Sequence, residues 1–295
     1  MTPTETGAQG STQLPLNAPI GVFDSGVGGL SVLRHIRAQL PHENLIYLAD
    51  SGYAPYGAKP EHVVAERSVA VAQFLVAQGA KALVVACNTA TVAAIKLLRA
   101  HYPTMPIVGV EPGLKPAAAA SRNGKVAVLA TDVTLAGEKF LLLRDQVSSA
   151  SNAVFLLQGC PGLVDQIELG EFDSDRTQAM LEAYLLPLLA EGVDTVVLGC
   201  THYPFVRVSI EGILAKAGRA DVVLIDTGDA VARQLARLLA SGDFLRPDNA
   251  GPASLRAFTT ASATALSVAF SSLLGLVPTV EEVKIEKRLE IPAAP

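Results

Sequence analysis

The sequence has no excess of basic charge. Its 295 residues include 23 Lys and Arg against 28 Asp and Glu, which gives a formal net charge of −5 at pH 7. A protein that binds the phosphate backbone of nucleic acids needs a basic surface to displace counterions, and no basic stripe is visible here. We therefore expect no nucleic-acid partner.

Cysteine is also scarce, and a secretion signal is missing from the start of the chain. Three widely spaced cysteines without a CxxC pair do not resemble the even-numbered disulfide framework of secreted domains. Residues 1–17 contain no Lys, no Arg and no apolar run, so they lack both parts of a signal peptide. We expect reduced thiols in a cytoplasmic protein and a disordered extension over residues 1–17.

A long apolar run of the kind that crosses a membrane is absent as well. Residues 257–280 carry no charge, but Ser and Thr side chains interrupt them, whereas a span needs about 20 predominantly apolar residues. Leu266, Phe270, Leu273 and Val277 recur at steps of three and four, which is the spacing of one buried helix face. The pattern predicts a core helix, and we expect no membrane partner.

Short apolar segments alternate with segments of helical periodicity along the chain. Continuous apolar strands separated by helices are typical of parallel sheets covered on both faces. The sequence therefore predicts an α/β fold with largely parallel sheets, and its length suggests two domains at about 150 residues each. The expected strands are 19–23, 44–49, 82–86, 107–110, 126–130, 153–157, 195–199 and 222–225.

A faint internal repeat relates the two halves of the sequence. Cys87 and Cys200 each follow an apolar strand and precede a helical segment, and the turn at Ser25 corresponds to the turn at Thr131. The repeat predicts two pseudo-symmetric α/β units. Since ligands of parallel sheets bind outside the carboxyl ends of strands, both cysteines stand where a site is expected.

The residues around these cysteines suggest thiol chemistry. A helix N-terminus carries partial positive charge, which favours a thiolate, so we interpret Cys87 and Cys200 as reactive. Cys160 has no counterpart in the other half and is interpreted as structural. His202 could relay a proton to Cys200 or bind a metal with it. A zinc site from both cysteines, His202 and Asp24 lacks the usual short ligand spacing, so we expect no metal.

Polar turns follow the first two predicted strands. Asp24 opens a glycine-rich turn that fits a dinucleotide fingerprint only in part, because Ser31 occupies its last glycine position. Asp50 could contact a ribose, but Asp24 would repel a pyrophosphate, so an ammonium group suits this turn better. Neither this turn nor the one at 51–57 contains Lys or Arg. The pattern fits a zwitterionic amino acid, with its carboxylates on hydroxyls, the Asn88 amide and backbone N–H groups.

Taken together, these motifs resemble those of the glutamate racemases, a group within the cofactor-independent aspartate/glutamate racemase family. The pairing of Cys-Asn-Thr-Ala-Thr with Gly-Cys-Thr-His-Tyr-Pro is highly specific, and the resemblance covers residues 18 to 289. The segments that carry it are 21–29, 54–57, 86–91, Cys160–Pro161 with Glu168, 198–204 and 225–228.

The resemblance implies a fold, a reaction and an assembly. The substrate would lie in the cleft between two α/β domains, 18–112 plus 227–289 and 113–226. L-glutamate and D-glutamate would be interconverted without pyridoxal phosphate or any other cofactor, which supplies D-glutamate for peptidoglycan in the cytoplasm. We also expect a homodimer.

The resemblance further implies roles for the matching residues. Cys87 would take the proton from D-glutamate and Cys200 from L-glutamate, on opposite faces of the α-carbon. Asp24 and His202 would assist proton transfer near one thiol or the other, and Glu168 would act on the Cys200 side. The residues expected to bind substrate are Asp24, Ser25, Tyr56, Gly57, Asn88, Thr89, Thr201 and His202.

Two alternatives and one departure from the family's pattern remain. The turn at 131–134 is looser than in the family, so we assign Thr134 no binding role. An aspartate racemase, or a related racemase or decarboxylase, would use the same fold on another substrate. A non-enzymatic protein could use the two thiols as a metal or redox site.

Overall fold

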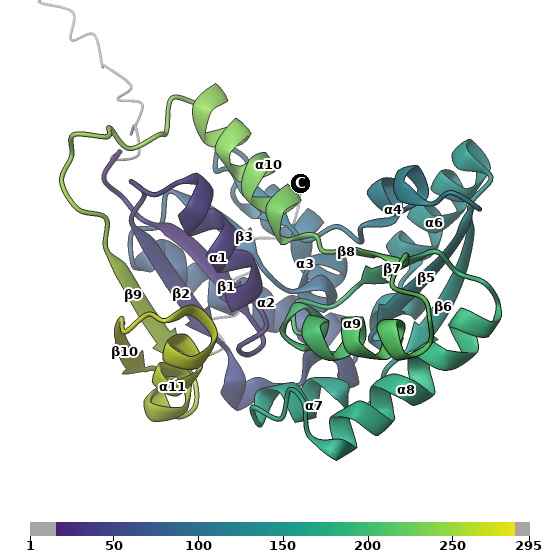
Figure 1. Ribbon diagram of the computed structural model, residues 1–295. Helices are drawn as coiled ribbons and strands as arrows, with labels where there is room; N and C mark the ends of the chain where they lie inside the picture. Colours follow the sequence, from purple (N-terminus) through teal and green to yellow (C-terminus); the bar gives the residue numbers. More distant parts are fainter. Residues whose placement is uncertain (1–15, 287–295) are drawn as a thin grey trace, which may run out of the picture.

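The computed structural model describes residues 16–286 and contains two β-sheets with helices on both faces of each (Figure 1). All eight expected strands are present and every described strand pair is parallel, which confirms the α/β prediction. The strands are β1 (Ile20–Asp24), β2 (Leu45–Ala49), β3 (Ala82–Val85), β4 (Ile107–Gly109), β5 (Lys125–Ala130), β6 (Val154–Gly159), β7 (Thr195–Leu198), β8 (Val223–Ile225), β9 (Leu255–Thr259) and β10 (Thr279–Glu282). The α-helices are α1 (Leu30–Gln39), α2 (Glu61–Ala77), α3 (Asn88–His101), α4 (Leu114–Ala120), α5 (Asp132–Ala136), α6 (Glu138–Ser151), α7 (Leu163–Glu168), α8 (Asp175–Ala190), α9 (Arg207–Lys216), α10 (Gly228–Ser241) and α11 (Ala263–Leu274).

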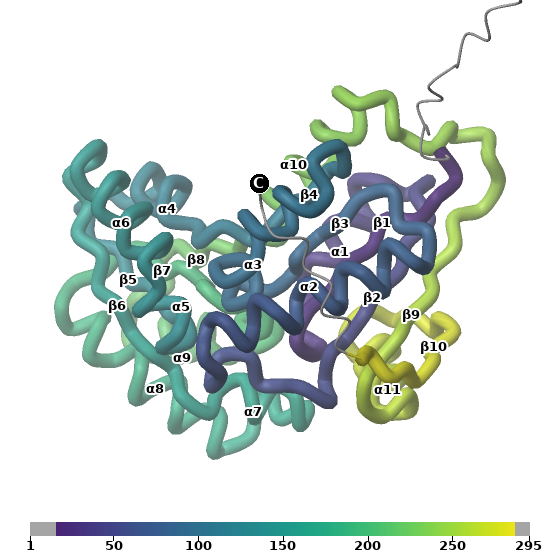
Figure 2. Tube along the Cα trace, turned by 180° about the vertical axis from the view of Figure 1, so that it is seen from behind, coloured from purple at the N-terminus to yellow at the C-terminus, as the bar shows by residue number. Residues whose placement is uncertain are grey.

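The strand order reveals the internal repeat in three dimensions. The first sheet runs β10-β9-β2-β1-β3-β4 and the second β6-β5-β7-β8. The order β2-β1-β3-β4 is therefore repeated four strands later in the chain, as the matched cysteine motifs predicted. Figures 1 and 2 both show β9, β10 and α11, in yellow-green to yellow, beside the purple and blue strands β1 and β2, so these late elements complete the first sheet.

Alternation along the strands places apolar side chains on both faces of each sheet. In β1, Val22 packs in a core cluster with α1, α10 and α11, whereas Phe23 packs on the other side with α2 and α3. In β7, Val196 packs with α7, α8 and α9, and Val197 with α4 and α6. With both faces covered, only the edges and ends of the sheets are free to carry polar groups.

The uncharged segment at 257–280 is helical only over α11. Leu266 and Phe270 are buried as predicted, and Leu273 packs against the same cluster. The expectation for Val277 is wrong, because this side chain is 88% exposed. The helix ends at Gly275, whose φ of 65° suits glycine and closes the helix before Val277. Within residues 16–286, no helix combines the length and apolarity needed to cross a membrane.

Parts of the expected extension and first domain lie outside the described residues, namely 1–15 and 287–289. Leu16 and Asn17, which we placed in the extension, are described. The Leu16 carbonyl accepts a hydrogen bond from Lys81 Nζ at 2.7 Å, and Asn17 takes part in two more hydrogen bonds. These two residues are therefore attached to the first sheet.

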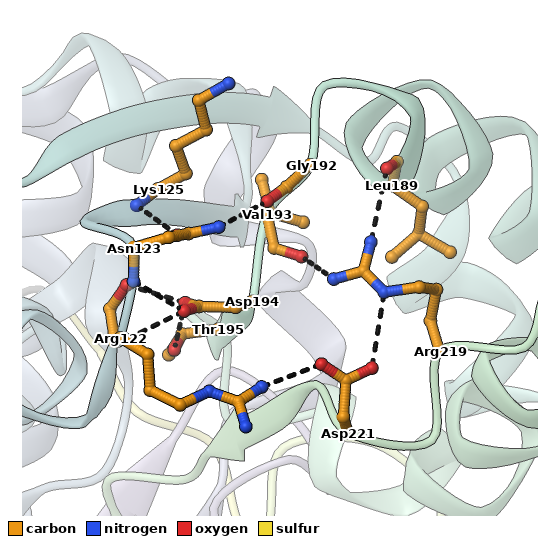
Figure 3. Close-up of polar contacts among 11 residues, drawn as sticks. Arg122, Asn123, Lys125, Leu189, Gly192, Val193, Asp194, Thr195, Arg219 and Asp221 are labelled. Carbon is orange, nitrogen blue, oxygen red and sulfur yellow. Dashed lines mark hydrogen bonds and ion pairs between the residues drawn. The ribbon is translucent and has the colours of Figure 1, made fainter.

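A buried carboxylate accepts several hydrogen bonds at the amino-terminal ends of the strands of the second sheet, as Figure 3 shows. Asp194, directly before β7, accepts hydrogen bonds from the backbone nitrogens of Arg122 at 2.7 Å and Asn123 at 2.9 Å. It also accepts one from Thr195 Oγ1 at 3.0 Å. These bonds join the loop before β5 to the start of β7. The carboxyl ends of the strands, on the opposite side of the sheet, remain open for a site.

Candidate active site

One cavity of about 290 Å³ lies at the carboxyl ends of strands from both sheets. All of the expected site residues line it except Glu168, which contacts the lining residue His202. No residue in the lining is Lys or Arg, so hydroxyls, the Asn88 amide and backbone N–H groups are the main donors available to a bound carboxylate. The expected residues in the lining are Asp24, Ser25, Tyr56, Gly57, Cys87, Asn88, Thr89, Cys200, Thr201 and His202.

Other polar residues that the sequence did not assign also line the cavity. The internal repeat carries a signal for Thr131, since it matched the turn at Ser25, whereas no motif marks Asp165 on α7. Thr134 and Cys160, to which we gave no binding role, are in the lining as well. The unassigned polar residues are Thr131, Asp132, Thr134, Cys160 and Asp165.

Cys87 lies two residues after the end of β3 and caps α3. Its Sγ accepts a hydrogen bond from Ala90 N at 3.5 Å and lies 4.0 Å from Ser25 Oγ. Burial raises the pKa of the Cys87 thiol well above its ordinary value, the neighbouring Asp24 raises it further, and the helix N–H lowers it less. The N–H at the helix terminus favours the thiolate, as expected, but burial of the thiol disfavours it more strongly.

Asp24 lies fully buried at the end of β1. Its carboxylate accepts hydrogen bonds from the backbone nitrogens of Ser25 at 2.7 Å and Gly29 at 2.6 Å. Thr201 Oγ1, from the second sheet, is 3.4 Å from Asp24 Oδ2. Burial raises the pKa of Asp24 above its usual value, more than His202 and the hydrogen bonds lower it. A positive group beside Asp24 would stabilise the ionised form of this carboxyl and lower its pKa.

Cys200, His202 and Glu168 form a continuous chain. Cys200 Sγ is 3.6 Å from His202 Nδ1, and His202 Nε2 is 2.6 Å from Glu168 Oε1. When Nε2 donates to Glu168, Nδ1 can exchange a proton with the thiol. Burial alone would lower the pKa of His202, but its bonds with Cys200 and Glu168 raise it well above the usual value. Burial would raise the pKa of Glu168, whereas the bond to His202 lowers it.

Two glycines of the turn after β1 make room for this chain. A Cβ atom at Gly26 would collide with the Glu168 carboxylate, and one at Gly28 would collide with the His202 ring. Val27 N, between them, donates to Glu168 Oε1 at 2.8 Å. These glycines therefore admit side chains of the second half of the chain.

Asn88 is the first residue of α3 and projects a polar group without a protein partner. Its side chain is buried, and both Oδ1 and Nδ2 lack hydrogen bonds within the described part of the chain. An unpaired buried amide costs about 1–3 kcal/mol, so a ligand that pairs with it recovers that free energy. Beside it, Thr89 Oγ1 lies 3.5 Å from Thr131 Oγ1, which brings the two sheets together at the cavity.

The described side chains of the cavity do not form a metal site or a pyridoxal phosphate site. Among residues 16–286, no three His, Cys, Asp or Glu side chains are grouped so that they could hold a metal ion. The lining has no lysine, the residue that forms the Schiff base with pyridoxal phosphate. The arrangement instead offers two thiols, each with its own acid–base neighbour.

Comparison with known proteins gives one consistent result. The profile of the Asp/Glu/Hydantoin racemase family matches residues 20–235. A glutamate racemase from Ectopseudomonas mendocina is 55% identical over 228 residues, which cover 77% of this chain and 84% of that protein.

Solved structures agree with this sequence match. Glutamate racemase from Francisella tularensis in complex with D-glutamate has a TM-score of 0.80 at 27% identity, over 92% of this chain and 99% of that chain. The Escherichia coli glutamate racemase in complex with L-glutamate and the activator UDP-MurNAc-Ala has a TM-score of 0.77 at 32% identity, over 91% of this chain and 99% of that chain.

Proposed function

Because the chain belongs to the Asp/Glu/Hydantoin racemase family, we propose that it interconverts L-glutamate and D-glutamate in the cavity between its two sheets. It is an isomerase, and its product D-glutamate serves peptidoglycan synthesis. The observation that carries the mechanism is that Cys87 and Cys200, from the two repeated halves, line the same cavity.

Inversion of the α-carbon requires that one group removes a proton from one face and another delivers a proton to the opposite face. From L-glutamate, the Cys200 thiolate removes the α-proton and the Cys87 thiol protonates the carbanion. From D-glutamate, the roles reverse. Before and after each turnover, one of the two cysteines is a thiol and the other is a thiolate. The two states that start the two directions therefore carry the same total number of protons.

The neighbours of each thiol prepare it for this exchange. On one side, His202 accepts the Cys200 proton at Nδ1 while its Nε2 donates to Glu168, and the resulting imidazolium is stabilised by that carboxylate. On the other side, a substrate ammonium bound at Asp24 brings positive charge close to Cys87. This charge lowers the free energy of the thiolate and offsets the burial that disfavours it.

The carbanion needs stabilisation that proton transfer alone does not supply, since general acid–base catalysis contributes about 10²–10⁴-fold. The amide of Asn88 and the hydroxyls of Ser25, Thr89 and Thr201 line the cavity. These donors, with the N-terminus of α3, are fixed by the fold before the substrate arrives. We propose that they hold the substrate carboxylates and stabilise charge as it develops.

The test is racemisation of pure L-glutamate, followed by loss of optical rotation. Cys87→Ser and Cys200→Ser should each reduce kcat/KM by about 10²-fold or more, because a serine hydroxyl is a far weaker acid–base group. The enantiomers have equal free energy, so each variant must lose kcat/KM equally in both directions. Full turnover in either variant would refute the two-cysteine mechanism.

Isotope exchange in heavy water separates the two thiols. Cys87→Ser keeps Cys200 and should incorporate deuterium into L-glutamate while forming no D-glutamate, and Cys200→Ser should do the same with D-glutamate. Exchange on the opposite enantiomers would reverse the assignment. Aspartate and other amino acids tested in parallel would identify a related racemase, and bound metal or a reversible disulfide in inactive protein would indicate a non-enzymatic thiol site.

We also propose the domain division, assembly and compartment that the family resemblance implied. The first domain comprises 18–112 with 227–289, the second comprises 113–226, and the enzyme is a cytoplasmic homodimer. Exposed apolar side chains such as Leu169 and Val268, which belong to or flank a second cavity of about 360 Å³, support a protein interface. Light scattering on the purified protein measures the assembly directly.

A further inference from the structure

A second buried carboxylate lies one strand away from Asp24. Asp50 directly follows β2, is fully buried, and does not line the cavity. Arg67 on α2 binds it in bidentate fashion, with Nε at 2.7 Å from Oδ2 and Nη2 at 2.6 Å from Oδ1. Tyr56 Oη donates to Oδ2 at 2.6 Å, and Thr260 Oγ1 donates to Oδ1 at 2.8 Å. Both oxygens of Asp50 are thus occupied by protein donors.

The hydroxyl of Tyr56 connects this carboxylate to the cavity. Tyr56 belongs to the lining, and so do the residues on either side of it, Pro55, Gly57 and Ala58. Its hydroxyl donates a hydrogen bond to Asp50, which lies outside the cavity lining. This bond holds the tyrosine in place on the side away from the cavity. The segment 55–58, which we call the cavity loop, therefore depends on Asp50 for its position.

Arg67 extends the same network to two further segments. Its guanidinium lies 4.8 Å from the centre of the Tyr53 ring, in a cation–π contact with the residues leading into the cavity loop. Its Nη1 donates to the carbonyl of Ile285 at 2.8 Å, near the end of the described chain. One guanidinium thus joins the cavity loop, α2 and the C-terminal segment that completes the first sheet.

Four hydrogen bonds satisfy the roughly four acceptor sites of the buried Asp50 carboxylate. A buried ion pair is costly to desolvate, and replacing it with apolar residues is often neutral or stabilising. The ion pair of Glu43 with Lys81, at 2.6 Å, is equally buried in the same half, yet neither residue belongs to the cavity lining. The difference between the two pairs is that Asp50 holds a residue of the cavity wall.

We infer that Asp50 and Arg67 are positioning residues for the racemisation, and that they act by fixing the cavity loop through the Tyr56 hydroxyl. This inference rests on the proposed function. The loop forms a wall for the substrate, whereas the thiols come from the ends of β3 and β7. Loosening the loop therefore weakens substrate binding more than it slows proton transfer between correctly placed thiols.

The test compares kinetic constants of variants at the Asp50–Tyr56 contact. Asp50→Asn replaces an acceptor oxygen with an NH₂ group that faces Arg67, and Tyr56→Phe removes only the hydroxyl. Each should raise KM for glutamate about tenfold and change kcat less than about threefold, as expected for loss of a hydrogen bond to a charged group. The double variant should show no larger rise than Asp50→Asn alone, because both changes break the same connection.

Glu43→Gln provides the matched control. It weakens a buried ion pair of the first half without touching the cavity loop, so it should lower the melting temperature and leave KM and kcat unchanged. A rise in KM as large as that of Asp50→Asn would overturn the inference, because the effect would then follow from lost stability in general.

The remaining outcomes separate this inference from the function on which it rests. If the wild-type protein does not racemise glutamate, both fail. If the wild type is active but Asp50→Asn and Tyr56→Phe keep the wild-type KM, or lose kcat alone, only the positioning role fails. Should Asp50→Asn not fold, Tyr56→Phe decides the question by itself, since removing one hydroxyl preserves the packing of the ring.

Discussion

At the scale of single residues, burial decides the protonation state of the first thiol. Cys87 has a helix N–H within hydrogen-bond distance, yet its pKa is raised because desolvation disfavours the thiolate and Asp24 repels it. The resting enzyme therefore keeps a proton on Cys87, which is the state required to protonate a carbanion formed from L-glutamate. The opposite state needs the charge of the substrate ammonium.

This protonation state can be measured directly by ultraviolet titration of thiolate absorbance. In Cys200→Ser without substrate, no thiolate signal should develop up to about pH 9, because burial raises the pKa of Cys87 above the ordinary thiol value of about 8.5. Cys160 does not interfere, since burial raises its pKa to about 12. The variant that lacks both Cys87 and Cys200 is the control for Cys160. A thiolate signal centred near the ordinary value would show that the helix terminus, and not burial, controls Cys87.

The sequence predicted which residues come together at the cavity better than it predicted their environments. Strand ends, the repeat and the family resemblance placed Cys87, Cys200 and His202 together, and the structure puts all three in the cavity lining. The resemblance placed Glu168 on the Cys200 side of the site but did not give its hydrogen bond with His202. That bond depends on a contact between segments that are far apart in the chain. The same reason explains why the support of Tyr56 by Asp50 could not be foreseen.

At the scale of elements, the strands with continuous apolar runs were predictable from the sequence, and the last two strands, β9 and β10, were not. The eight strands found from sequence lie in the repeated part of the two sheets. β9 contains Arg256 and β10 contains Glu281 and Glu282, so neither shows an uninterrupted apolar run. Their position is set by pairing with β2 and with each other, which is information that a local pattern does not contain.

For the loop before β5, we predict a substitution that lowers stability and leaves activity unchanged. Asp194→Ala removes the acceptor for the backbone nitrogens of Arg122 and Asn123 and should lower the free energy of unfolding by about 2 kcal/mol. Racemase activity of the folded variant should be retained, because the cavity lies at the other ends of the strands. Chemical denaturation measures the loss, and Asp221→Ala is the control, since this exposed partner of Arg122 should matter little. Equal loss in both variants would contradict a special role for Asp194.

At the scale of the whole molecule, a repeated fold is used to surround one carbon atom from two sides. The order β2-β1-β3-β4 and its repeat β6-β5-β7-β8 place equivalent cysteines at equivalent strand ends. The sequence could predict this equivalence, but the relative placement of the halves came from the family resemblance. Contacts such as Thr89 with Thr131 and Val27 with Glu168 join the halves at the cavity, so its shape belongs to neither half alone.

A ligand held between the halves should stabilise the molecule as a unit. Glutamate at 100 times its Kd should add about 2.7 kcal/mol to the free energy of unfolding, which corresponds to a rise in melting temperature of about 4–5 °C. Asn88→Ala should lose most of this rise, because its amide is the unpaired buried group of the cavity. Without ligand, the same variant should be as stable as the wild type or more stable, since it removes an unsatisfied polar group. Scanning calorimetry with and without glutamate distinguishes these effects, and an undiminished shift in Asn88→Ala would show that the substrate binds without this amide.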